Sequence, residues 1–417
     1  QVRQPNPHVR AGEITPERDN VNLVIHHPEQ EQPPWSGTVL AVHIVRIMSE
    51  VLGVGSLILT WHLMRELFPS QAWVATIVTA VQAFTPMHLF ISSSVNNDNL
   101  TIPLCTWALL LMVRRVKRAA EHQAAPLPPR QSLILGGVLG MTLLTKTSGL
   151  GLLPFVGATL AWEAWQRSHF VSWQDNLVQF SRDLAGIMVP AVAISGWWYY
   201  RNLRLYGDLL GWRAFEAVLG TRDVPASLGQ LWSERQAFAA GYWGNFGGLN
   251  VPMADWTYRL LNGLAIGAAA GLVVGLIRWL RDGEPLVQKI WPFAWTPLTA
   301  ARALAWAWPV AIFVSWIRWA TTTWSSQGRL IFPALPLWSL ALVLGLSAWL
   351  PRRWRTYRAA LSGAFATFLF ALSVVALPVW IAPAYRPPQA LTDTAHPARY
   401  TQVNATFGET LTLVGYH

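Results

Sequence analysis

The sequence is poor in charged side chains. Only 12% of its 417 residues are Asp, Glu, Lys or Arg, whereas soluble domains contain about 25%. Hydrophobic residues make up 53% of the chain, and several apolar runs approach the ~20 residues that a helix needs to cross a bilayer. This composition argues against an ordinary soluble domain and predicts an all-α, polytopic membrane protein.

Cysteine is almost absent, and so are the familiar catalytic and metal-binding motifs. The single cysteine, Cys105, lies inside an apolar run, so the chain has no disulfide framework. The sequence contains no Gly-rich phosphate loop ending in Lys-Ser/Thr, no Cys-x-x-Cys and no His-Glu-x-x-His. We interpret the formal net charge of +10 as arginine in cytoplasmic loops, and we expect no nucleic-acid partner.

The apolar runs predict about ten transmembrane helices. They cover residues 38–63, 71–91, 99–113, 132–144, 150–162, 183–200, 260–279, 303–319, 330–350 and 361–381. Clusters of Arg and Lys follow alternate runs, beginning at 114–118, and mark cytoplasmic loops under the positive-inside rule. With these loops inside, the moderately polar stretch 163–182 would lie on the cytoplasmic surface. The outer face would carry residues 1–37, Asp98, Lys146, the segment 201–259 and Arg329.

The chain divides into three parts. Residues 1–37 are polar and are predicted to be the remnant of a first outer loop, and residues 38–382 form the transmembrane domain with its outer segment 201–259. Residues 383–417 form an outer tail that ends in strand-like alternation, which predicts the start of a truncated β-rich domain. Because the chain begins at Gln1 with no Met and no signal peptide, we expect a fragment whose first membrane helix is missing.

Two apolar runs are joined by the polar stretch 96–99, Asn-Asn-Asp-Asn. In one interpretation Asn and Asp cap the following helix, since both are good N-cap residues. In the other, Asp98 is a site residue, because a carboxylate at membrane depth is costly unless it is bonded, paired or hydrated. Both interpretations remain open at this point, with Asn97 beside Asp98 as a second candidate.

The cations near the outer face also allow two interpretations each. Arg46 could pair with Glu50 on one helix face or bind a phosphate with its guanidinium. Lys146 could extend to the interface or bind the same phosphate. Arg329 follows Gln327 and Gly328 at an outer helix end, where the positive-inside bias does not favour arginine. Arg201 follows four aromatic residues, 197–200, which fit an interfacial belt or a sugar-stacking surface.

A metal site has little support. His26 and His27 lie near Glu29 and Glu31, but adjacent histidines in a loop are more often solvated than bound to an ion. We therefore expect no metal, although these residues could bind a divalent ion.

Five short motifs together resemble bacterial multi-spanning membrane proteins related to the GT-C glycosyltransferases, of the dolichyl-phosphate-mannose-protein-mannosyltransferase type. They are 94–98 (Ser-Val-Asn-Asn-Asp), 143–149 (Leu-Leu-Thr-Lys-Thr-Ser-Gly), 197–208, 243–252 and 327–336. The resemblance implies a GT-C bundle that transfers a sugar from a polyprenyl-phosphate donor, with inversion at the sugar C1. It also implies a bacterial cytoplasmic membrane, with the active face extracytoplasmic.

Under this resemblance, Asp98 is the candidate catalytic residue, and it would orient the acceptor or the base. The candidates for substrate binding are Asn97, Lys146, Arg329, Arg46 and Arg201. Related transferases also carry an acidic motif after a first membrane helix. Glu13, Glu17 and Asp19 lack that setting, so its role is not assigned to them.

Two other functions stay open. The chain could be a non-catalytic GT-C-like subunit that scaffolds a membrane complex with other proteins, since the first-loop acidic motif is not found. A secondary transporter is less favoured, because no paired inverted repeat with broken helices is evident. No cofactor is expected beyond the lipid-linked sugar and the surrounding membrane lipid.

Overall fold

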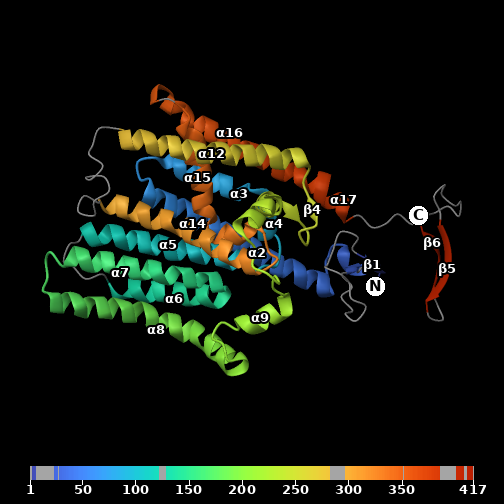
Figure 1. Ribbon diagram of the computed structural model, residues 1–417, viewed down its shortest axis with the longest axis horizontal. Coiled ribbons are helices and arrows are strands. Elements are labelled where there is room, and N and C mark those ends of the chain that lie inside the picture. The colour runs from blue at the N-terminus through green and yellow to red at the C-terminus, as the bar shows by residue number, and fades with distance from the viewer. Residues whose placement is uncertain are drawn as a thin grey trace.

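The structure is a bundle of long helices lying side by side (Figure 1). It is a computed structural model that describes residues 2–5, 23–26, 28–121, 128–281, 296–350, 352–385, 401–407 and 411–416. Every apolar run that the sequence assigned to a membrane helix is helical over most of its length. The prediction of an all-α polytopic membrane protein is confirmed.

The helices that run along the bundle follow one another with reversals of direction. They are α2 (Gly37–Leu67), α3 (Ala72–Ala83) with α4 (Pro86–Ser92), α5 (Asp98–Glu121), α6 (Pro129–Thr145), α7 (Leu153–Arg167), α8 (Trp173–Tyr206), α12 (Asp255–Arg281), α14 (Pro297–Thr322), α15 (Leu335–Ala348) and α16 (Arg358–Ala376). Short 3-10 helices precede α7 (η1, Thr147–Leu152), α15 (η3, Gly328–Ala334) and α16 (η4, Arg352–Tyr357). After α16, a π-helical turn (Leu377–Ile381) leads into α17 (Ala382–Ala384).

Fewer of these helices meet the requirements of a membrane span than the sequence predicted. Among the described residues, seven helices are long and apolar enough to cross a membrane, or eight if the bent pair α3–α4 is one span. The pair bends by 69° at Pro86, which begins α4 and cannot continue α3. The other two predicted spans are α6 and α7, with 17 and 15 residues, which is less than the ~20 that a bilayer needs.

The two ends of the bundle carry different parts of the chain. We call the end where α5 begins and α6 finishes the Asp98 end, and the opposite end the Arg115 end. Hydrogen bonds fix the register: Arg46 of α2 reaches Ser93 at the Asp98 end, and Arg302 of α14 reaches Leu67 at the Arg115 end. In Figure 1 the Asp98 end is on the right, with both chain termini beyond it.

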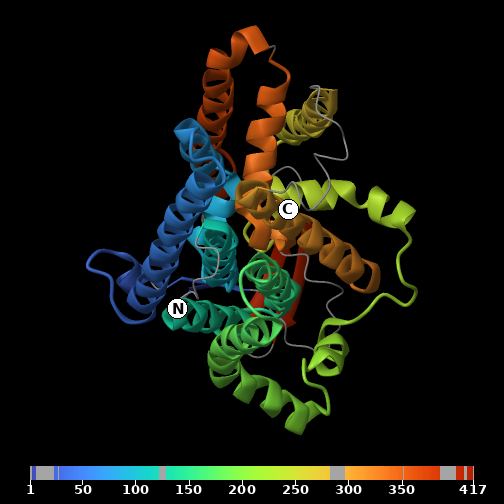
Figure 2. The ribbon, with the colours of Figure 1, turned by 90° about the vertical axis from the view of Figure 1, so that its left-hand side faces the viewer.

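Helix α5 is the centre of the bundle. Within its apolar window 78% of the residues are buried, against 17% for α2, α8 and α12. It contacts α2, α6, α7 and α14, and a view along the helices shows α8 and α16 on opposite sides of it (Figure 2). The outer helices therefore present apolar side chains outward, as a bundle surrounded by lipid requires.

Four buried charges join α5, α6, α7 and α8 near the Arg115 end. Arg115 donates to both oxygens of Glu163, at 2.7 and 2.8 Å, and to the Ser132 hydroxyl at 2.9 Å. Asp183 accepts from Ser132, and Arg167 lies 3.9 Å from Glu163 and 3.8 Å from Asp183. The two cations and two anions thus neutralise one another, and this attraction offsets the desolvation cost of burying them.

This cluster corrects one sequence prediction. Residues 163–182 were expected on the cytoplasmic surface because they are moderately polar. Most residues from 168 to 182 are exposed, but Glu163 is fully buried and Arg167 is 5% exposed, and α8 is one continuous helix of 34 residues from Trp173. These two charges are buried because they form ion pairs with residues of other helices. The polarity of neighbouring residues in the sequence does not reveal such pairs.

Helices α12 and α15 approach each other through glycine. A Cβ added to Gly345 would overlap the backbone of Ala268, and one added to Gly271 would overlap the backbone of Gly345. Small residues allow such close helix contact in membranes, so these glycines set the distance between the two helices.

The strands form three small hairpins outside the main bundle. β1 (Val2–Pro5) pairs with β2 (Leu23–His26), and β3 (Asn245–Phe246) pairs with β4 (Val251–Pro252). β5 (Thr401–Phe407) pairs antiparallel with β6 (Leu411–Tyr416), where the sequence predicted strand-like alternation. Glu13, Glu17, Asp19 and His27 lie outside the described residues.

Replacing Gly345 by alanine should destabilise the fold, because the added methyl meets a backbone carbonyl that cannot move aside. We expect Gly345→Ala to cost about 1–3 kcal/mol, the usual cost of overpacking, and to lower the melting temperature of the detergent-solubilised protein. The matched control is Gly363→Ala in α16, where nothing lies within 4 Å of the added Cβ. Equal melting temperatures for the two variants would contradict close α12–α15 contact.

Candidate functional site

The polar hairpin before α5 places Asp98 at the mouth of the bundle. The Asn96 side chain accepts a hydrogen bond from the Asp98 backbone N–H at 2.9 Å, which satisfies one of the free N–H groups at the start of a helix. Asn99 donates to the Ser94 carbonyl at 2.6 Å. Asn96 is therefore a capping residue, whereas the Asp98 carboxylate is left for another partner.

That partner is Lys146. The ammonium lies 2.5 Å from Asp98 Oδ1, and the side chains are 20% and 3% exposed. The backbone of Lys146 is extended rather than helical, with φ −158° and ψ 139°. Its side chain therefore turns back from the end of α6 towards the start of α5. The structure thus brings together two predicted site residues that are 48 positions apart, and Lys146 does not simply extend to the interface.

Arg46 is close to the same hairpin but not to Glu50. Its Nε donates to the Ser93 carbonyl at 2.9 Å, and in the described residues no ion pair joins it to Glu50. Of the two interpretations of Arg46, the intrahelical pair is therefore not the one observed, because the hairpin carbonyl competes for the guanidinium. Ser93 is five residues before Asp98, so Arg46 holds the segment that leads into the carboxylate.

Arg329 sits at the start of η3, on the loop that follows α14. Gly328 precedes it, and a Cβ there would overlap the backbone of Phe238 and Tyr242 in α11, so only glycine allows this approach. Arg329 Nε donates to the neutral Gln327 side chain at 3.0 Å. Within the described parts of the chain it has no carboxylate partner, which leaves its positive charge uncompensated.

Arg201 and Asn97 are more exposed. The Arg201 guanidinium lies 5.0 Å from the centre of the Trp198 ring, and such cation–π contacts contribute about 0.5–1 kcal/mol at exposed sites. Tyr199 donates to the Leu143 carbonyl at 2.8 Å, while Trp197 and Tyr200 are exposed. This arrangement agrees with an interfacial aromatic belt. The Asn97 side chain is exposed and makes no hydrogen bond in the described residues.

The segment 201–259, at the Asp98 end, is partly helical, with α9 (Trp212–Leu219), α10 (Leu228–Ser233) and α11 (Arg235–Trp243). A second buried cation fastens it to the bundle. Arg222, 6% exposed, donates to both oxygens of Glu234 at 2.8 and 2.7 Å and to the Thr323 carbonyl at 3.0 Å. Ser326 also donates to Glu234. The sequence analysis did not predict this pair. Its only sequence signal is that two opposite charges lie twelve residues apart in a chain with few charged residues.

The motif at 243–252 forms the β3–β4 hairpin. Gly247 and Leu249 have φ of +62° and +70°, a region that favours glycine. Tyr258 donates to the Gly244 carbonyl and accepts from the Met253 N–H, at 2.6 and 2.8 Å. These contacts give the motif a structural role at the Asp98 end.

The Arg222–Glu234 pair should make the attachment of the segment 201–259 to the bundle pH-dependent. Hydrogen bonds from Arg222 and then from Ser326 lower the pKa of Glu234, although burial opposes them. A lowered folded-state pKa means that the stabilisation is full above the unfolded value, about 4.3, and is lost as the pH falls through the folded value. We expect faster hydrogen exchange in residues 222–234 as the pH is lowered from 6 to 3, after correction for intrinsic exchange.

The variant Glu234→Gln should exchange faster at pH 6 and lose most of this pH dependence. Asp223→Asn is the control, because Asp223 is exposed and adjacent to Arg222 but outside the pair. If Glu234→Gln retained the pH profile of the unmodified protein, another group would have to be responsible.

One known protein family matches part of the chain. Residues 41–194 match the family described as dolichyl-phosphate-mannose-protein mannosyltransferase, over a little more than a third of the chain. Neither a curated protein nor a solved structure matches the chain. The matched segment includes Arg46, Asp98 and Lys146, whereas Arg201 and Arg329 lie beyond it. This part of the chain is therefore similar to that family.

Proposed function

We propose that the protein is an inverting membrane glycosyltransferase that takes a sugar from a polyprenyl-phosphate donor at the Asp98 end. The family match suggests a GT-C-like glycosyltransferase. The observation that carries the finer proposal is the Asp98–Lys146 pair, inside the matched segment and at the mouth of the bundle. In the proposed reaction this pair supplies a carboxylate for the acceptor hydroxyl and an ammonium for the lipid phosphate.

The reaction forms one bond, breaks another and transfers one proton. An acceptor hydroxyl oxygen attacks C1 of the sugar, the bond from C1 to the phosphate oxygen breaks with its electrons on the phosphate, and the hydroxyl proton goes to a base. Asp98 Oδ1 is bound to Lys146, while Oδ2 makes no hydrogen bond in the described part of the chain. Oδ2 is thus available to orient the acceptor hydroxyl or the base.

The cations differ in how well they suit the departing phosphate. Arg329 has no described carboxylate partner, so a phosphate would complete its charge balance, and its planar fork matches phosphate geometry. Lys146 is already neutralised by Asp98 and would be shared between the two anions. Arg46 and Arg201 are exposed and have other contacts, so their contribution would be to attract the anion rather than to bind it closely.

The distribution of basic residues supports an extracytoplasmic active face. The Arg115 end carries the cluster at 114–118 and the arginines that close α12, and the positive-inside rule assigns such an end to the cytoplasm. The Asp98 end then faces outward, with the outer segment 201–259 along the membrane surface. We propose the bacterial cytoplasmic membrane as the location.

One observation favours the alternative of a non-catalytic scaffold. The Asp98–Lys146 pair joins the start of α5 to the end of α6, and this structural role needs no substrate. In that case the free charge of Arg329 would serve contacts with another subunit.

Labelling with cysteine tests the orientation. In a Cys105→Ser background, Asn97→Cys and Arg201→Cys should react with a membrane-impermeant maleimide added to intact cells, because both positions are exposed at the Asp98 end. Arg182→Cys, exposed near the Arg115 end, should react only after permeabilisation. The opposite pattern would place the proposed active face in the cytoplasm.

Activity measurements separate the enzyme from the scaffold. Proteoliposomes would receive polyprenyl-phosphate mannose as the probe donor and cell-envelope extract as the acceptor source, and the released polyprenyl phosphate would be measured. Asp98→Asn should slow release by about 10²-fold or more, the usual range for loss of acid–base assistance. Donor binding should not weaken, because the phosphate then no longer competes with Asp98 for Lys146. Arg329→Gln should weaken donor binding about tenfold, since a charge-assisted hydrogen bond contributes about 1.5–3 kcal/mol.

Arg204→Gln is the matched control, an exposed arginine at the same end, and should behave as the unmodified protein. Melting temperatures of all variants would exclude loss of fold. If Asp98→Asn lowered the melting temperature but the unmodified protein released no polyprenyl phosphate, the scaffold would be favoured.

A further inference from the structure

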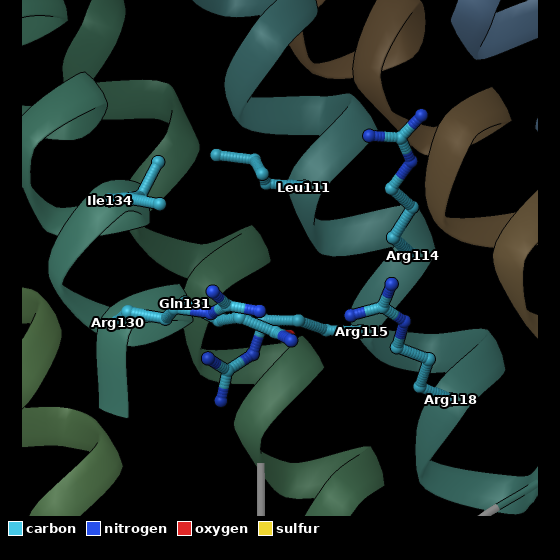
Figure 3. A pocket seen from close by; sticks show the side chains of 7 residues that line it. All are labelled: Leu111, Arg114, Arg115, Arg118, Arg130, Gln131 and Ile134. Carbon is cyan, nitrogen blue, oxygen red and sulfur yellow. The ribbon is translucent and has the colours of Figure 1, made fainter. Parts of the chain in front are cut away.

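A cavity of about 280 Å³ opens between α5 and α6 at the Arg115 end. Four of its seven lining residues are arginines (Figure 3). The lining residues are Leu111, Arg114, Arg115, Arg118, Arg130, Gln131 and Ile134. This volume lies just below the ~300 Å³ of small ligand sites, so the cavity suits a single head group rather than a larger molecule.

The four arginines are not equally engaged. Arg115 is 1% exposed and is held by Glu163 and Ser132, so it forms a fixed wall. Arg114 lies 2.8 Å from Glu66. Arg118 and Arg130 are exposed, and in the described residues neither has an ion-pair partner. The cavity therefore keeps excess positive charge at its opening.

The rest of the lining is Gln131 and an apolar part that continues onto the outside of the bundle. Leu111 and Ile134 line the cavity, and Ile134 is 44% exposed beside Leu133, which is 51% exposed. Exposed apolar side chains on a membrane bundle face acyl chains. A ligand that fits this cavity thus combines an anionic group with a hydrocarbon chain.

The cavity is separate from the proposed catalytic site. Arg114 follows Asp98 by sixteen residues along α5, and sixteen residues of α-helix span about 24 Å. A phosphate at one end cannot contact the other, so a ligand here would not be the sugar donor in its reactive position.

We propose that this cavity binds the phosphate group of an anionic membrane lipid, with Arg118 and Arg130 as its main contacts and an acyl chain along Leu111 and Ile134. Arginine binds phosphate through charge-assisted, often bidentate hydrogen bonds. Basic pockets between membrane helices are known to bind lipid head groups. A lipid bound there bridges α5 and α6 beside the buried charge cluster.

The test uses the full chain in detergent and a fluorescent short-chain phosphatidylglycerol, with binding followed by anisotropy. The double variant Arg118→Gln/Arg130→Gln should weaken binding about tenfold or more, because each arginine near a lipid surface contributes about 1 kcal/mol. Arg118→Lys/Arg130→Lys should retain much of the affinity. Arg182→Gln is the matched control, since it removes one exposed charge on α8 outside the cavity.

Competition identifies the source of the phosphate. Unlabelled phosphatidylglycerol should displace the probe, whereas phosphatidylcholine of the same chain length and inorganic phosphate should displace it at least tenfold less well. Equal competition by inorganic phosphate would overturn the proposal of a lipid ligand and would indicate a site for free phosphate. Unchanged affinity in the double glutamine variant, or an equal loss in Arg182→Gln, would overturn the site itself.

Discussion

The buried cluster of Arg115, Glu163, Asp183 and Arg167 is the interaction on which the arrangement of α5 to α8 depends. Two cations and two carboxylates meet in a part of the bundle that excludes water, and removing one member would leave an uncompensated charge at a cost of about 3–5 kcal/mol. Each of the four helices contributes to the cluster, since Ser132 of α6 bridges Arg115 and Asp183. The cluster therefore fixes how these helices lie relative to the central α5, and with it the position of Lys146 at the far end of α6.

The same constraint makes unbalanced charges informative. In a chain with 12% charged residues, the buried cations Arg115 and Arg222 each have carboxylate partners. Arg329 at the Asp98 end, and Arg118 and Arg130 at the Arg115 end, have none among the described residues. They are among the cations of the chain that an anion from outside could balance, and both proposals use this difference between balanced and unbalanced charge.

The sequence predicted the helices and their alternation well, because apolar runs and arginine clusters are local signals. It also predicted that Asp98 and Lys146 would share an end, since counting reversals is enough to place both there. It failed where the partner is distant and not implied by a local pattern. Arg46 binds the Ser93 carbonyl rather than Glu50, and the charges of Glu163 and Arg167 are buried by pairing across helices. The link from Arg222 to Glu234 and Ser326 could not be predicted either, since Ser326 is 92 positions from Glu234.

The Asp98–Lys146 pair limits how the proposed reaction can work. A phosphate that approaches Lys146 brings negative charge next to Asp98, and the two anions then compete for one ammonium. A second cation is needed to offset that repulsion, and Arg329, which has no described carboxylate partner, can supply it if the bound donor lies between them. As the phosphate draws Lys146 away, Asp98 loses its partner and gains affinity for a hydrogen-bond donor, such as the acceptor hydroxyl. Donor and acceptor binding would thus be linked through a single lysine. The scaffold alternative provides no reason for such a link, because there the pair has only to remain closed.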